Sequence, residues 1–322
     1  MRQLHLLWVY LIKLVTQTQR LKTFTLHSHL LAFNPLSPNG VNAEEKTPGL
    51  IITTKNQRYP ENSTSRWTSD KVGFDLNPEA FQAFINGLIP GFRFKEFIAR
   101  EEAETISIAI RAHIREYKTA KGVGRAGATY VEHPKDFGEY AQYSAILRDR
   151  NISIPYRLEL ADKITSYLAR NTDYDFRPLR SGRIEFFWGL FRQINTGAGW
   201  HLDDVTKDGK IFKSRKSIFQ GSVVLHIKTP KIGGETIIAD RRAQKGDKKY
   251  RNPKPDDWTY VSEMFEGISK AEVPAVAGDL IVLSTLNYHT VQPCLEEGAE
   301  RISFSMFIVI FADQPKVIYY YN

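Results

Sequence analysis

Residues 277–311 decide the fold, and they read AGDLIVLSTLNYHTVQPCLEEGAERISFSMFIVIF. A Gly-Asp turn leads into a short apolar strand at 280–283, and a longer apolar strand at 302–311 ends the stretch. A continuous apolar strand of this kind is typical of a sheet that is covered on both faces. His289 and Arg301 lie between the two strands, so a polar site is expected beside them.

The same alternation of strands and turns extends upstream. Residues 183–195 are rich in aromatic and branched side chains and predict a buried strand, which the turn TGAG at 196–199 ends. His201 and Asp203 follow directly, and a Gly-Gly turn at 230–235 enters the next strand. The order strand, His-x-Asp, strands, turn, strand, His, Arg, strand is typical of a double-stranded β-helix, the jelly-roll or cupin-like barrel. We therefore expect an all-β core with flanking helices.

His201, Asp203 and His289 form the predicted metal and catalytic centre. Two imidazoles and one carboxylate make the facial triad that holds Fe(II) and leaves positions open for oxygen and a co-substrate. Arg301 lies twelve residues after the second histidine (301 − 289) and is suited to clamp a dicarboxylate bidentately. Together these residues predict an oxygenase that uses Fe(II), 2-oxoglutarate and O2. A His-x-Asp pair alone is weak evidence, because it also occurs in surface turns, and an isolated arginine at a strand start can form a surface ion pair.

Five further residues are assigned weaker roles. Ser303, two residues after the arginine, shares its strand face and could donate a hydroxyl to the far carboxylate of 2-oxoglutarate. Gln193 and Asn195 could hydrogen-bond the keto acid, although ordinary capping of a strand end is an equal alternative. Asp204 either orients a ligand or is a solvated acid. His226 lies in the middle of an apolar strand and is interpreted as structural.

The chain also resembles a known superfamily, the Fe(II)/2-oxoglutarate-dependent oxygenases. The likeness rests on GGET at 233–236, on AGDLIVL at 277–283 and on the spacing from the second His to the Arg, and it covers 183–322. Within the superfamily the chain is most similar to the free-standing enzymes that halogenate or hydroxylate unactivated carbons of hapalindole-type alkaloids. Halogenases of that group carry Gly or Ala where this chain has Asp203, so the resemblance implies hydroxylation.

The implied reaction is hydroxylation of an unactivated carbon of a small amino acid or alkaloid-like molecule in specialised metabolism, with release of succinate and CO2. Desaturation or cyclisation, a carrier-bound or macromolecular substrate, and a non-catalytic jelly-roll binding module remain as alternatives. Nucleic-acid demethylases of the superfamily carry a second Arg where this chain has Phe307, and prolyl hydroxylases typically use Lys where it has Arg301. Both differences argue against those substrates.

The predicted domain organisation is a single oxygenase domain at 56–322, with supporting helices at about 77–175 and the β-helix core at about 180–322. One helix is expected to begin at Asn77-Pro78, a second to span 101–117, and a third to follow Pro155 with Leu158 on its buried face. The glycine-rich residues 122–127 are expected to form a loop. Residues 1–55 are interpreted as a disordered extension or an artefact of start-site choice.

Charge and composition limit the kinds of partner and the compartment that the sequence predicts. The net charge of +8 comes from 44 basic and 36 acidic residues, and basic clusters at 207–216 and 241–251 could attract an anionic substrate or an acidic carrier protein. Solvated lysine-rich loops are an equal alternative. The single cysteine, Cys294, excludes an internal disulfide and favours the cytoplasm. No apolar window is long enough to span a bilayer, and neither a nucleic-acid partner nor an oligomeric state is predicted.

Overall fold

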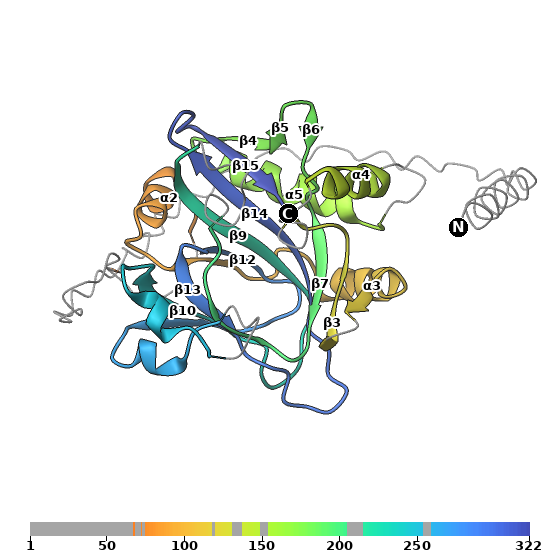
Figure 1. Cartoon of the computed structure of the whole chain (residues 1–322). Helices are drawn as coiled ribbons and strands as arrows, with labels where there is room; N and C mark the ends of the chain where they lie inside the picture. Colours follow the sequence, from red (N-terminus) through yellow and green to blue (C-terminus); the bar gives the residue numbers. More distant parts are fainter. Residues whose placement is uncertain are drawn as a thin grey trace, which may run out of the picture. The chain divides into compact units, whose positions relative to one another are not determined.

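Residues 51–322 form one compact unit in the computed structural model of the chain, shown in Figure 1. The structure describes Trp67, Val72 and residues 75–117, 120–130, 137–148, 154–204, 215–253 and 259–322. The extension expected at 1–55 lies outside these residues.

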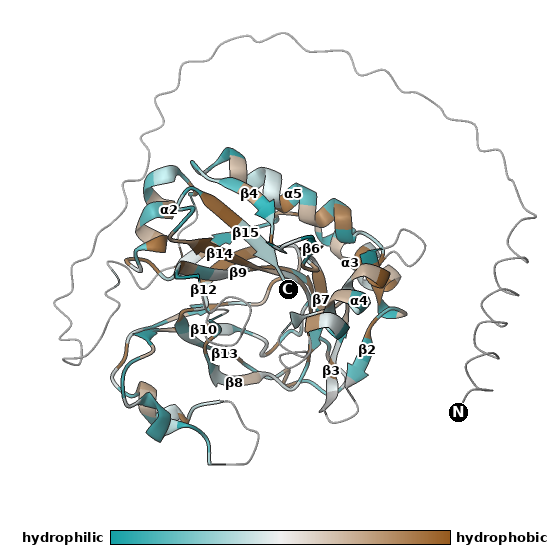
Figure 2. Ribbon diagram, turned by 45° about the horizontal axis from the view of Figure 1, so that its top comes forward, coloured by the Kyte–Doolittle hydropathy of each residue, from teal (hydrophilic) through white to brown (hydrophobic). Residues whose placement is uncertain are grey.

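A large mixed sheet forms one side of the barrel. Its path runs in the order β1 (Gly91–Phe94), β12 (Leu280–Ser284), β9 (Ser217–Lys228), β14 (Ile302–Phe311), β7 (Leu190–Ile194), β3 (Ala120–Ala126) and β2 (Arg115–Tyr117). Two more strands join it, because β15 (Val317–Tyr321) pairs with β14 and β4 (Asp175–Pro178) pairs with β15. β9 and β14 lie at the centre and are coloured largely hydrophobic in Figure 2.

A smaller sheet forms the other side, in the order β11 (Lys270–Val273), β10 (Thr236–Arg242), β13 (Asn287–Val291) and β8 (Ala198–His201). Along the chain, β7, β9, β12 and β14 belong to the large sheet, whereas β8, β10, β11 and β13 belong to the small one. This alternation between two facing sheets is the double-stranded β-helix that the sequence predicted. A separate hairpin pairs β5 (Arg180–Ser181) with β6 (Ile184–Glu185).

Helices cover the outer face of the large sheet. They are α2 (Pro78–Ile85), α3 (Arg100–Arg111), α4 (Phe137–Arg148) and α5 (Arg157–Arg170). Two short 3-10 helices, η4 (Asp247–Tyr250) and η5 (Ser262–Phe265), lie between β10 and β11. Each α-helix contributes to one buried core that includes Val223, Leu225 and Ile227 of β9. Because side chains alternate along a strand, the intervening residues of β9 face the interior between the sheets. There the small apolar cluster around Ile281 fills part of the space.

Several boundaries differ from those expected. The strand at 183–195 is divided into β6 and β7, because Gly189 adopts φ +77 and turns the chain over the ring of Phe304. The helix expected at 101–117 ends at Arg111, and its last residues form β2 instead. Leu158 is 53% exposed, since the buried face of α5 runs through Leu160.

Residues 122–127 are not a loop. Most of them belong to β3, which pairs with both β2 and β7. Gly124 permits the close approach of β2, because a Cβ there would lie 2.9 Å from the carbonyl oxygen of Arg115. The large sheet therefore takes strands from the region assigned to supporting helices. The prediction at Asn77 was correct, and its Oδ1 accepts a hydrogen bond from the amide of Ala80 at the start of α2.

Candidate metal centre

The two strands β8 and β13 bring the predicted ligands together. His201 ends β8 and pairs in register with His289 on β13. Asp203 follows two residues later, and its backbone is held by Thr285: the amide of Asp203 donates to the Thr285 carbonyl at 3.0 Å, and the Thr285 hydroxyl donates back at 3.3 Å. One ligand atom from each of the three side chains lies within 4.8 Å of the others, the only such cluster of three or more His, Cys, Asp and Glu among the described residues.

Backbone carbonyls orient both imidazoles. Nδ1 of His201 lies 2.6 Å from the carbonyl oxygen of Gly199, and Nδ1 of His289 lies 3.0 Å from that of Asn287. A carbonyl can only accept, so Nδ1 carries the proton and Nε2 has its lone pair available for a metal. Nε2 of His289 is 3.6 Å from Oδ2 of Asp203. A proton on Nδ1 and a free lone pair on Nε2 is the tautomer in which a histidine can bind a metal through Nε2.

The first imidazole is kept neutral by its surroundings. Burial, together with the proximity of His289 and Arg192, lowers the pKa of His201 to about 4, against the opposing effects of Asp203 and of the Gly199 carbonyl. Metal ligation requires a neutral imidazole. At neutral pH His201 is therefore ready to bind a cation without losing a proton.

Arg301 is buried beside this centre. It is 3% exposed, its Nε donates to the carbonyl of Gly234 at 3.0 Å, and burial lowers the pKa of its guanidinium to about 10. Among the described residues, no carboxylate lies within salt-bridge distance of it. A surface ion pair is thereby excluded as its role. A buried guanidinium of this kind is costly unless an anion joins it.

Ser303 and His226 lie next to this arginine. They face each other in the register of β14 and β9, and Ser303 lines the cavity that also contains Arg301. His226 is fully buried, and neither of its ring nitrogens has a hydrogen-bond partner among the described residues. Burial lowers its pKa well below the usual value, and the charge of Arg301 acts in the same direction. The interpretation of His226 as purely structural therefore leaves two buried polar atoms unexplained.

Asn195 and Gln193, whose carboxamides were predicted to hydrogen-bond the keto acid, make other contacts. Asn195 accepts the backbone N–H of Arg301 at 3.0 Å, and its own backbone bonds Gly122 and Cys294. It anchors the arginine and does not line the cavity. Gln193 lies at the cavity wall, but its register opposite Ile302 places its side chain on the core face of the sheet. The predicted contact of either carboxamide with a keto acid has no support in this arrangement.

A cavity of about 450 Å³ joins these groups. The triad, Arg301 and Ser303 line it, and so do Arg192, Phe307 and Asn322, which the sequence did not single out. Among the described residues of its wall, the charged side chains besides the histidines are two arginines and one carboxylate, Asp203. Strand alternation on β14, which places 301, 303, 305 and 307 on one face, is the sequence signal that could have found Phe307.

The remaining predicted residues are also placed. Asp204 is buried, which excludes a solvated acid. The basic cluster at 207–216 falls largely outside the described residues, although Arg215 pairs with Asp313 and stacks on Phe311. In the second cluster, Arg241 pairs with Asp247 at 2.6 Å. Each of these two arginines is therefore engaged within the fold.

Comparisons with known proteins give distant relatives. No family model matches the chain. The L-gamma-glutamyl-L-propargylglycine hydroxylase of Streptantibioticus cattleyicolor is 26% identical over 144 residues, which are 44% of this chain and 52% of that protein, so the chain spans about half the length of its curated relative. An N-substituted L-amino acid dioxygenase from Burkholderia ambifaria aligns with a TM-score of 0.49 and 14% identity over 76% of this chain and 91% of that one. A Pseudomonas putida prolyl-4-hydroxylase aligns with a TM-score of 0.36 and 14% identity over 70% and 95%.

Within the described part of the chain, no helix combines the length and the apolar composition needed to cross a membrane.

Proposed function

We propose that this chain is an Fe(II)- and 2-oxoglutarate-dependent dioxygenase that hydroxylates a small, amino acid-like molecule. One observation carries the proposal: the ligand atoms of His201, Asp203 and His289 converge within 4.8 Å in the same cavity as a buried arginine that has no carboxylate partner among the described residues. A two-histidine, one-carboxylate face with open positions is the donor set of non-haem iron oxygenases.

The residues present also fit the co-substrate. Arg301 offers a guanidinium and Ser303 a hydroxyl at the cavity wall, and His226, which pairs in register with Ser303, offers an unpartnered ring N–H. Neutral His226 donates through one nitrogen only, so a carboxylate oxygen is a suitable acceptor. The far carboxylate of 2-oxoglutarate would receive hydrogen bonds from these three groups, which would give one of the two unpartnered nitrogens of His226 an acceptor.

Fe(II) with 2-oxoglutarate and O2 supplies the oxidising power that breaks an unactivated C–H bond and yields succinate and CO2. The chain positions these components. His201, His289 and the Asp203 carboxylate would hold the metal, and Arg301 would bind the far carboxylate of the co-substrate. The cavity wall keeps bulk water from the reacting carbon.

Asp203 decides which oxidation is favoured. Its carboxylate occupies the place that is vacant in the halogenases that the chain resembles, so hydroxylation is proposed over halogenation. Membership of the hapalindole-type group remains a prediction. The hydroxylase name of the Streptantibioticus cattleyicolor relative supports this reaction type and an amino acid-like substrate. Product mass separates hydroxylation, which adds one oxygen atom, from desaturation or cyclisation, which removes two hydrogens.

The test is anaerobic addition of Fe(II) and 2-oxoglutarate to the purified protein. A weak visible charge-transfer band should form in the wild type and be absent from His289→Ala, which removes one imidazole ligand. Arg301→Leu should require much more 2-oxoglutarate, because it removes the carboxylate partner. A wild type that retains stoichiometric iron and shows no band would refute the oxygenase assignment and favour a non-catalytic binding module. A carrier-bound substrate would show as turnover only with the acylated carrier.

A further inference from the structure

The carboxamide of Asn322 is a buried polar group with no assigned role. Asn322 is 1% exposed and lines the cavity of the metal centre, and neither its Oδ1 nor its Nδ2 has a hydrogen-bond partner among the described residues. It follows Tyr321, which pairs with Phe307 on β14. Phe307 is six residues beyond Arg301, about 20 Å along the strand. In this antiparallel register Asn322 comes opposite Met306, near the middle of β14 and five residues from Arg301 (306 − 301).

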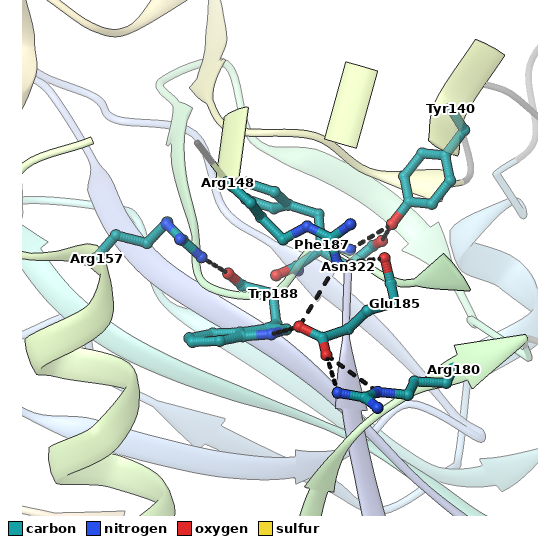
Figure 3. Close-up of polar contacts among 8 residues, drawn as sticks. All are labelled: Tyr140, Arg148, Arg157, Arg180, Glu185, Phe187, Trp188 and Asn322. Atoms are coloured by element: carbon teal, nitrogen blue, oxygen red, sulfur yellow. Dashed lines mark hydrogen bonds and ion pairs between the residues drawn. The ribbon is translucent and has the colours of Figure 1, made fainter. Parts of the chain in front are cut away.

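The backbone of Asn322 is fixed from several directions. Its amide donates to the carbonyl of Phe187 at 2.6 Å, and its own carbonyl accepts from the hydroxyl of Tyr140 at 2.9 Å and from the amide of Tyr130 at 3.2 Å. The same Tyr140 hydroxyl accepts the amide of Phe187 at 2.9 Å, so one side chain bridges both segments. Figure 3 shows Tyr140 beside Asn322 and Phe187. The amide and the carbonyl oxygen of Asn322 are thus both engaged, whereas its carboxamide has no partner among the described residues.

The segment that holds Asn322 is itself braced. Arg157 donates to the carbonyl of Trp188 at 2.9 Å, Arg148 donates to that of Glu185 at 2.6 Å, and Arg180 pairs with the Glu185 side chain at 2.6 Å (Figure 3). These contacts fix the backbone segment to which the backbone of Asn322 is bonded. A buried carboxamide without an internal partner, carried on a fixed backbone at the wall of a cavity, is suited to bind a polar group that enters the cavity.

The chemistry of that partner follows from the donor and acceptor set. A carboxamide offers one acceptor and an NH2 donor, which match the N–H and the C=O of an amide. Arg192 is the cation at this part of the wall: it lies 5.9 Å from the ring of Phe307, and its charge reaches His201. A guanidinium favours a carboxylate.

We propose that Asn322 binds the substrate, and that the substrate is an N-acylated amino acid or dipeptide whose amide pairs with Asn322 and whose carboxylate pairs with Arg192. This rests on the proposed function, because it names the substrate class of the same site. The substrate subsite then lies beside Phe307, near the middle of β14, and the co-substrate subsite lies at Arg301, just before the strand begins.

The test uses the full chain under anaerobic conditions with Fe(II) and 2-oxoglutarate. The probes are the N-acetyl derivatives of the common amino acids, and binding is read as a change in the charge-transfer band. The tightest probe is then compared with two analogues: the 2-acetoxy acid, in which oxygen replaces the amide N–H, and the primary amide, which lacks the carboxylate. The variants are Asn322→Leu and Arg192→Gln. Asn171→Leu is the matched control, because the carboxamide of Asn171 donates within the protein to Tyr167 at 2.7 Å.

In Asn322→Leu the band with 2-oxoglutarate alone should be unchanged and the melting temperature should not fall, because an unpartnered group is removed. Affinity for the N-acetyl probe should fall by about tenfold or more, the worth of one to two hydrogen bonds. The acetoxy analogue should bind wild type and Asn322→Leu alike, and the primary amide should bind wild type and Arg192→Gln alike. Asn171→Leu should show the reverse pattern, with a lower melting temperature and unchanged probe affinity.

Two results would overturn the inference alone: equal affinity of wild type and Asn322→Leu for the probe, or a normal band with 2-oxoglutarate that no N-acetyl amino acid perturbs. A lowered melting temperature in Asn322→Leu with unchanged probe affinity would assign the residue a structural role and would also overturn it. Absence of the band from the wild type is a different failure, because it refutes the proposed function itself.

Discussion

Replacing His226 with leucine should weaken 2-oxoglutarate binding without destabilising the protein. His226 is fully buried, its two ring nitrogens have no partner among the described residues, and it pairs in register with Ser303. Removing an unsatisfied buried polar group costs no internal hydrogen bond, so the free energy of unfolding of the metal-free protein should stay the same or rise. A structural histidine would give the opposite result.

The loss of affinity can be estimated from the contact proposed. A hydrogen bond to a charged carboxylate contributes about 1.5–3 kcal/mol, which corresponds to roughly 10- to 100-fold in the dissociation constant. The assay is an anaerobic titration of the Fe(II)-loaded protein, followed by the charge-transfer band. Titration with 2-oxobutyrate is the decisive comparison, because that keto acid lacks the far carboxylate and should bind the wild type and His226→Leu equally.

The matched control is Ser305→Ala. Ser305 lines the same cavity, but its hydroxyl donates to the carbonyl of Leu190 and it lies two residues farther from Arg301 than Ser303 does. Its removal should leave 2-oxoglutarate binding within about twofold. The assignment of His226 to the far carboxylate is wrong if His226→Leu binds 2-oxoglutarate as tightly as the wild type does. It is also wrong if the variant loses as much affinity for 2-oxobutyrate as it loses for 2-oxoglutarate.

Three further predictions test the surroundings of the site. Asn195→Ala should lower the free energy of unfolding by about 1–3 kcal/mol in denaturant titrations and raise the 2-oxoglutarate requirement, because it removes the acceptor of the Arg301 amide at 3.0 Å; an unchanged requirement would contradict its anchoring role. Gly124→Val should destabilise the protein by more than about 1 kcal/mol, measured the same way, because its Cβ would lie 2.9 Å from a carbonyl of β2. Acidification of the metal-free protein should lower its free energy of unfolding. Burial lowers the pKa of His226 in the folded state, so the unfolded chain binds more protons and stability is lost as the pH falls below about 6.5. The free energy of unfolding should fall less steeply with pH in His226→Leu.

The sequence predicted those parts of the molecule that have a local signal. The strand at Ile302–Phe311 was predicted with its correct bounds, because a long apolar run between charged and polar residues is a strong pattern. His201 and Asp203 were found because they are close in the sequence and follow a turn. The pairing of His289 with His201 required only that the barrel close, which the order of strands already implied.

The parts that were missed depend on long-range packing. β3 was read as a loop because glycine is rare in strands, yet Gly124 is required where the backbone of β2 comes close. His226 looked structural because its neighbours in the strand are apolar, and only the register with Ser303 places it near Arg301. Asn322 follows an aromatic run, and nothing local indicates that its backbone is held by a segment 135 positions earlier (322 − 187).

The two unpartnered side chains can be tested together, because His226 pairs in register with Ser303, whereas Asn322 follows Tyr321, the partner of Phe307. In the registers of β14, His226 lies opposite Ser303 and Asn322 comes opposite Met306, on strands that pair with opposite sides of β14. The two side chains are therefore about 10 Å apart along β14, the separation from which substitutions usually add. His226→Leu should therefore change the affinity for 2-oxoglutarate and leave that for the N-acetyl probe unchanged once the co-substrate saturates, and Asn322→Leu should do the reverse. The double variant should show the sum of the two free-energy changes. A double variant whose losses are smaller than that sum would mean that both side chains act on one ligand, and the division of the cavity into a co-substrate end and a substrate end would have to be abandoned.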